Sequence, residues 1–207
     1  MSNERHEFSP DQRPVAERRS SERVTSVYRP VLIEAKNFVG FCLLRNLSSG
    51  GMMGKAFSEF AVGQQIKVRL PSDTAMSGTI SWSKEGNIGI RFDDEIDVDQ
   101  VLRQLSEKKP GEQINRPPRL AIDCVGSLEI GQEFIRIRLH DISQRGIKAE
   151  IKGVKPGDEG VVHLPGLECQ TAVVRWTHGE LAGLNFVSPL AFGQLALWVI
   201  ERQSPLR

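Results

Sequence analysis

Two groups of polar residues with the chemistry of an anion-binding site lie near the start of the chain. The first is the arginine pair Arg19-x-x-x-Arg23, and the second is Asn46-x-Ser48-x-x-Gly51, which begins 23 residues after the pair. The planar guanidinium of arginine pairs with two phosphate oxygens or with the O6 and N7 atoms of guanine, and it stacks on bases. In a turn, Asn and Ser either bond their own backbone or reach a base edge, while Gly permits a positive φ or close approach of a ligand.

The second pattern recurs later in the chain, which indicates an internal duplication. Its copy is Asp141-x-Ser143-x-x-Gly146, 95 positions further on. Other landmarks repeat at nearly the same offset: Arg69-Leu70-Pro71 and His163-Leu164-Pro165, Trp82 and Trp176, and Gly89-x-x-Phe92 and Gly183-x-x-Phe186. A chain of 207 residues accommodates two domains of this repeat length, each with its own core.

The arginine pair and the turn, followed by a late Trp and a Gly-x-x-Phe, together resemble the PilZ family. The resemblance implies a mainly β fold of two tandem antiparallel six-stranded barrels, each closed by a C-terminal helix. It also implies a bacterial receptor for the second messenger cyclic di-GMP. It assigns ligand contacts to Arg19, Arg23, Asn46 and Ser48, a turn role to Gly51, and contact with a second, stacked ligand molecule to Arg18, which matches a frequent arginine of the family.

Apolar residues follow the same β pattern in both repeats. Short runs, many of them alternating, are separated by Gly, Ser, Asn and Asp, which favours an antiparallel sheet or barrel over helices. The runs lie at 31–33, 41–44, 66–70, 79–82 and 88–92 in the first repeat, and at 120–125, 134–139, 147–151, 160–164, 171–176 and 181–186 in the second.

A helix is predicted at the end of each repeat. Residues 93–105 open with acids, which suit the free amides of a helix N-terminus, and their apolar residues share one face. Residues 189–203 begin at a proline and are apolar on almost every side in the last turns. We therefore expect the final helix to lie between the barrels or against another chain, as in a homodimer.

These patterns divide the chain into four parts. Residues 1–17 are charged, contain prolines and show no apolar period, so they predict a flexible segment. The first PilZ-like domain is expected at 18–106, a linker rich in charge and proline at 107–115, and a second PilZ-like domain at 116–203.

The second repeat departs from the family pattern upstream of its turn. Its candidate site consists of Arg116, Arg119, Asp141, Ser143 and Gly146. If Arg119 aligns with the second arginine of the pair, Asn115 takes the place of the first. If Arg116 is used instead, the spacing is three rather than four. Because two prolines also fix the local backbone, we expect this barrel to bind the nucleotide weakly or not at all.

The composition of the chain disfavours several other functions, cellular locations and cofactors. A net charge of +1 and a single Tyr disfavour a nucleic-acid-binding barrel. Three cysteines without C-x-x-C spacing, an N-terminal segment without an apolar core, and the lack of a long apolar stretch predict a cytoplasmic protein without a disulfide framework or a membrane span. The histidines lack metal-ligand spacing, so no metal or other cofactor is expected.

The remaining alternatives concern mechanism. His140-Asp141-x-Ser143 is not interpreted as a catalytic triad, because neighbours along one strand do not point at one another, and no enzyme activity is predicted. A nucleotide-independent scaffold that acts through an unknown protein partner is the alternative to a receptor. Trp82 and Trp176 are interpreted as core residues, with stacking on a base as the alternative. Met52 and Met53 are interpreted as fillers of gaps in the core, with a partner surface as the alternative.

Overall fold

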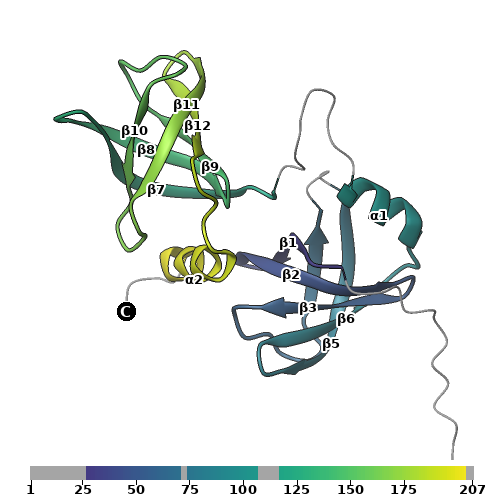
Figure 1. The fold of residues 1–207 in the computed structure, drawn as a ribbon. Helices are drawn as coiled ribbons and strands as arrows, with labels where there is room; N and C mark the ends of the chain where they lie inside the picture. The colour runs from purple at the N-terminus through teal and green to yellow at the C-terminus, as the bar shows by residue number, and fades with distance from the viewer. Residues whose placement is uncertain (1–26, 71–73, 107–116, 204–207) are drawn as a thin grey trace, which may run out of the picture.

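The computed structural model describes residues 27–70, 74–106 and 117–203. They form two closed antiparallel barrels with the same topology (Figure 1), β1-β2-β3-β6-β5-β4 and β10-β11-β12-β9-β8-β7. Each barrel has six strands, and a helix follows its last strand. The predicted fold class is therefore confirmed.

The elements of the two barrels occur in the same order along the chain. The first barrel consists of β1 (Arg29–Ala35), β2 (Phe38–Ser48), β3 (Gly51–Ala56), β4 (Gln65–Arg69), β5 (Ala75–Lys84) and β6 (Asn87–Phe92), followed by α1 (Val98–Ser106). The second consists of β7 (Leu120–Ile130), β8 (Glu133–Ser143), β9 (Gly146–Glu150), β10 (Glu159–His163), β11 (Gln170–His178) and β12 (Leu181–Phe186), followed by α2 (Phe192–Gln203).

In each barrel, every second side chain along a strand points inward, and these side chains fill the interior. In β4, Ile66 and Val68 are buried while Gln65 and Lys67 are exposed, as expected for a strand with one face on the core. Every run predicted for the second repeat lies within or overlaps an observed strand. In the first repeat β3 was not predicted, because its sequence GMMGKA lacks β-branched and aromatic residues and contains two glycines.

A bulge recurs at equivalent places in both barrels. The β2–β3 register shifts between Leu44 and Asn46, and the β5–β6 register shifts between Ile80 and Trp82. The second barrel repeats these shifts before Asp141 and Trp176. A bulge bends its strand and re-aims the side chains beside it, so the duplicated bulges set the direction of both motif turns and both tryptophans.

Helix α1 packs on the first barrel. Val101 and Leu105 are buried in that barrel's core. The Asp97 carboxylate accepts a hydrogen bond from the Gln100 amide (3.0 Å) and caps the helix. The helix begins at Val98, five residues into the predicted segment. The acidic residues before it lie in the loop that leads to the helix, and Asp97 caps the first turn.

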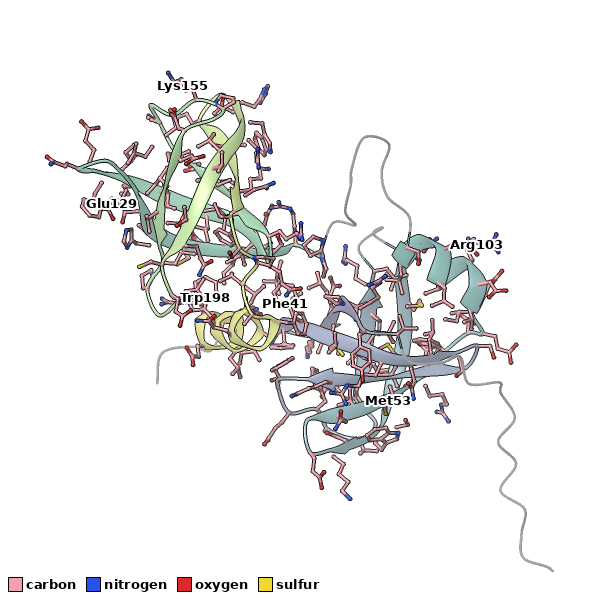
Figure 2. The ribbon with its side chains drawn as sticks, viewed as in Figure 1. Phe41, Met53, Arg103, Glu129, Lys155 and Trp198 are labelled. Carbon is pink, nitrogen blue, oxygen red and sulfur yellow. The ribbon has the colours of Figure 1, made fainter. Side chains whose placement is uncertain are left out.

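Helix α2 lies between the two barrels (Figure 1). Leu195 and Trp198 are buried in the core cluster of the second barrel, and Phe41 of β2 belongs to the same cluster (Figure 2). The Phe192 ring meets the rings of Phe41 and Phe57 edge to face, with centroids 6.0 and 5.6 Å apart. The first of the two locations expected for this helix is thus confirmed, and contact with another chain stays a prediction.

The last residue of α2 binds the backbone of β2. The Val39 amide donates to Gln203 Oε1 (3.1 Å), and Gln203 Nε2 donates to the Val39 carbonyl oxygen (2.6 Å). Strand β3 pairs with β2 only from Cys42 onward, so Gln203 takes the place of a strand neighbour at Val39. Among the described helices, none is long and apolar enough to cross a bilayer.

Candidate functional site

A cavity of about 540 Å³ opens on the first barrel at the turn between β2 and β3. Asn46, Ser48 and Gly51, the three described residues of the predicted site, line it together. Arg18, Arg19 and Arg23 lie outside the described residues. The rest of the lining consists of Leu47, Ser49, Gly50, Met52, Met53, Ser81, Trp82, Gly89, Ile90, Arg91, Phe92 and Glu95.

The turn itself is held by a bond between its serine and its glycine. Ser48 Oγ donates to the Gly51 carbonyl oxygen (3.1 Å). Gly51 does not have a positive φ. A Cβ built on Gly51 would instead collide with the carbonyl oxygen of Ile90 on β6. The glycine is therefore required for the close approach of two strands.

Asn46 presents an unused amide to the cavity. It follows the bulge in β2, and its side chain is partly exposed. Within the described ranges, that amide has no hydrogen-bond partner in the protein. An amide carries two donors and an acceptor, so Asn46 can read a base edge without giving up an internal bond.

Trp82 lies at the cavity and not in the core, so its core interpretation was wrong. It is 40% exposed, and its cross-strand partner is Gly89. A Cβ on Gly89 would fall on the indole ring, which means that the ring lies flat over the glycine. Trp176, 42% exposed, covers Gly183 in the same way. The signal in the sequence was the paired repeat of Trp with Gly-x-x-Phe, since aromatic rings cover cross-strand glycines.

Arg91 is a second residue of the cavity that the sequence reasoning missed. It lies in β6 directly opposite Gly51 and is exposed. Its position between Gly89 and Phe92 in the repeated Gly-x-x-Phe pattern was the available signal. Met52 is buried as expected, whereas Met53 of β3 (Figure 2) lines the cavity and is only partly buried. The described part of the site thus combines an amide, a hydroxyl, an indole and a guanidinium.

The equivalent turn in the second barrel is more closed. Asp141 forms an ion pair with Arg119 (Oδ1 to Nη1, 2.5 Å). Ser143 is fully buried, and its hydroxyl donates to the Gly146 carbonyl oxygen (3.2 Å). Arg116 lies outside the described residues. Both polar side chains of this turn are therefore engaged within the barrel.

In the part of the chain that the structure describes, neither a cluster of metal ligands nor a strongly perturbed acid marks another site. The described residues contain no group of His, Cys, Asp and Glu suited to hold a metal ion. The Arg138 guanidinium lowers the pKa of Asp123 through a bidentate contact on the surface of the second barrel. Burial raises the pKa of Cys42 to about 12 in the first core.

Comparison with known proteins gives a family match and several likenesses of fold. A comparison with curated proteins gives no significant match. Solved structures similar to this chain include the PlzA protein of Borreliella burgdorferi in complex with c-di-GMP, at 12% identity, 83% coverage of this chain, 87% of that chain and a TM-score of 0.37. Another is the inhibitor of motility MotI (DgrA) of Bacillus subtilis, at 16% identity, 86% and 97% coverage and a TM-score of 0.36. A third is MrkH of K. pneumonia with c-di-GMP, at 11% identity, 84% and 85% coverage and a TM-score of 0.33.

The family model described as PilZ domain matches residues 17–108. This match takes in the arginine pair, the motif turn and the whole first barrel, and it identifies this part of the chain as a PilZ domain.

Proposed function

We propose that the protein is a receptor for cyclic di-GMP that binds the dinucleotide through its first PilZ domain. The observation that carries the proposal is the convergence of Asn46, Ser48 and Gly51 on one open cavity within the matched domain. That cavity also holds Trp82 and Arg91. The receptor is non-catalytic and resides in the cytoplasm in this proposal.

Chain connectivity keeps the arginine pair within reach of this cavity. The Val27 amide donates to the Arg45 carbonyl oxygen (2.7 Å), and Arg45 directly precedes Asn46. Four residues of extended chain span at most about 14 Å, so the Cα of Arg23 is no farther than that from the Cα of Val27. A segment that begins beside Asn46 can fold its two arginines over a ligand in the cavity.

Each group has a distinct task in the proposed complex. The guanidinium groups of Arg19 and Arg23 pair with the phosphates and the O6/N7 edges of guanine. Ser48 Oγ donates its hydrogen bond to the Gly51 carbonyl oxygen, and its lone pairs can accept hydrogen bonds from guanine N–H groups. Trp82 offers an indole for stacking, and Arg91 adds a cation. Arg18 contacts a second stacked ligand molecule.

Strand β2 connects the proposed site with the second barrel. Asn46 and Ser48 lie at one end of this strand, whereas Val39 and Phe41 at its other end contact α2. Ligand binding that shifts β2 changes the free energy of this contact and hence the arrangement of the barrels. By family resemblance, the output is control of motility, attachment or exopolysaccharide.

The second barrel has a different role in this proposal, as the structural or partner-binding domain of the chain. Its Asp141 is neutralised by Arg119, and Ser143 is inaccessible. A nucleotide-independent scaffold is the alternative for the whole chain, and the same binding experiment distinguishes it from a receptor.

Isothermal titration of the full chain with cyclic di-GMP tests the proposal, with GMP and cyclic di-AMP as controls. We expect saturable binding of cyclic di-GMP only. Hydrogen bonds to charged groups contribute about 1.5–3 kcal/mol each, so Arg19→Ala with Arg23→Ala should weaken binding at least about 100-fold. Arg103→Ala, which removes an exposed arginine of α1, is the matched control. Retained affinity in the double variant would overturn the site, and absence of heat in the wild type would favour the scaffold.

A further inference from the structure

Three side chains with the chemistry of an activated thiol lie in series on the second barrel. Cys169 Sγ is 3.1 Å from His163 Nδ1, and His163 Nε2 is 2.7 Å from Glu129 Oε2. Cys169 is exposed, whereas His163 and Glu129 are each about one-third exposed. A nucleophile in contact with a base that a third group orients is the arrangement found in nucleophilic sites.

The backbone of the barrel builds this series from separate elements. In the β7–β10 ladder, His163 is paired with Ser127, and Glu129 lies two residues further along the same face. Glu129 of β7 is labelled in Figure 2. A tight turn, closed by the Leu167 amide and the Leu164 carbonyl oxygen (3.1 Å), brings Cys169 back toward the histidine.

The contacts of His163 define its tautomer. A carboxylate only accepts hydrogen bonds, so Nε2 must carry the proton that faces Glu129. In the neutral ring, Nδ1 is then the acceptor in contact with the thiol. When Nδ1 takes the thiol proton, the Glu129 carboxylate stabilises the resulting imidazolium. The Phe134 ring, 5.7 Å from the imidazole by centroid, packs beside this pair.

The first barrel has a simple ion pair at the equivalent place. There Arg69 Nη2 is 2.7 Å from Glu34, in the equivalent β1–β4 ladder. A cross-strand ion pair therefore accounts for Glu129 facing His163. It does not account for the histidine in place of arginine, or for a thiol at the other ring nitrogen, and these two differences create a base and a nucleophile.

We propose that Cys169 is a site of thiol–disulfide exchange with low-molecular-weight disulfides, with His163 as the base and Glu129 as a positioning residue. His163 Nδ1 takes the thiol proton, and Cys169 Sγ attacks one sulfur of the small disulfide. A protein–small-molecule disulfide forms, the original S–S bond breaks, and the departing thiolate receives the proton from His163. The Cys169 sulfur is oxidised and the small disulfide is reduced to one thiol.

The expected size of the effect follows from ordinary thiol chemistry. A cysteine without a neighbouring base, with a pKa of about 8.5, is roughly 3% thiolate at pH 7, so about 30-fold is the upper limit of the gain that a base can give. The nucleophilicity of a thiolate falls as its thiol becomes more acidic, so only part of that gain is realised. We therefore expect exchange about fivefold to tenfold faster in the wild type than in His163→Gln.

The test measures the reaction of the full chain with an aromatic disulfide that releases a coloured thiolate, and with oxidised glutathione by mass spectrometry. Cys42 and Cys124 are buried, so the fast phase should consist of one thiol and vanish in Cys169→Ser. His140→Gln is the matched control, because His140 contacts Glu150 at 2.7 Å without a thiol partner.

Glu129 is tested separately, with thermal unfolding of every variant as a check of folding. Glu129→Gln should slow the fast phase, and Glu129→Asp should restore part of the rate because it keeps a carboxylate. Equal exchange rates in the wild type, His163→Gln and His140→Gln would overturn the proposal. A fast phase that persists in Cys169→Ser would overturn it as well.

Discussion

The contact of Gln203 with β2 offers a direct measure of how the barrels are coupled. Its side-chain amide makes two hydrogen bonds with the backbone of Val39, one in each direction. The Val39 amide faces the part of β2 that β3 does not cover. Replacing Gln203 by Ala removes both bonds and leaves a backbone donor and acceptor to be satisfied by water.

The structure sets the size of the expected effect. Each bond is part-buried, and a typical net contribution is about 0.5–1.5 kcal/mol, so the loss of both costs about 1–3 kcal/mol of docking free energy. Since about 1.4 kcal/mol corresponds to a factor of ten, the undocked population should rise about fivefold to 100-fold. The rings of Phe192 and Phe41 remain in place, so the contact should weaken without being abolished.

Hydrogen exchange of the Val39 amide is the assay, because this donor is bonded to Gln203 and its exposure reports separation of α2 from β2. We expect its exchange to accelerate by at least the same factor in Gln203→Ala, because the variant removes the acceptor of this amide as well as weakening the docking, while amides within the β1–β2 ladder keep their protection. Gln65→Ala is the matched control, since the Gln65 side chain bonds Thr79 within the first barrel. Unchanged exchange at Val39 would refute the reasoning.

Two further predictions concern the first barrel. Cyclic di-GMP should change the intrinsic fluorescence through Trp82 at the cavity, so Trp82→Phe should lose the change and Trp176→Phe should keep it; the reverse pattern would place the ligand on the second barrel. Burial raises the pKa of Cys42 from 9.0 to about 12, so the folded state holds its proton more tightly than the unfolded state. Stability is therefore full below about pH 9 and should fall by about 1.4 kcal/mol per pH unit above it. Urea unfolding at pH 8 and 10 checks this, and the slope should be smaller in Cys42→Ala.

Strands whose own sequence alternates between apolar and polar residues were predictable. The strand that depends on packing against neighbouring strands was not. Ile66 and Val68 alternate with polar residues, so β4 was evident from its period. The strand β3 has no such signal, because it contains Gly51, Gly54 and two methionines. A Cβ at Gly54 would collide with Cys42 of β2, so this strand is specified by packing against partners distant in the sequence, which a local pattern does not record.

Residues that the sequence groups through their position in one turn also lie together in the structure, and their role in ligand binding stays a prediction. Asn46, Ser48 and Gly51 are close in sequence, and they meet in one cavity. Arg91 and Trp82 reach the same cavity from β6 and β5 through ladder pairing. Trp82 was misassigned to the core because simple alternation places it inside, whereas the bulge after Ile80 turns it outward.

Comparison of the two turns separates the structural part of the motif from its chemical part. The bond from serine Oγ to the glycine carbonyl oxygen is present in both barrels, at 3.1 and 3.2 Å. In both, a Cβ on the glycine would collide with a backbone carbonyl oxygen of the neighbouring strand. The Ser-x-x-Gly half is therefore a requirement of the β2–β3 turn and its copy, whether or not a ligand binds. What differs is the first position, where Asn46, whose amide has no partner among the described residues, is replaced by Asp141 bound to Arg119. Ligand binding in such repeats should therefore be judged from the first turn residue and the arginines upstream, since the serine and glycine persist for reasons of folding.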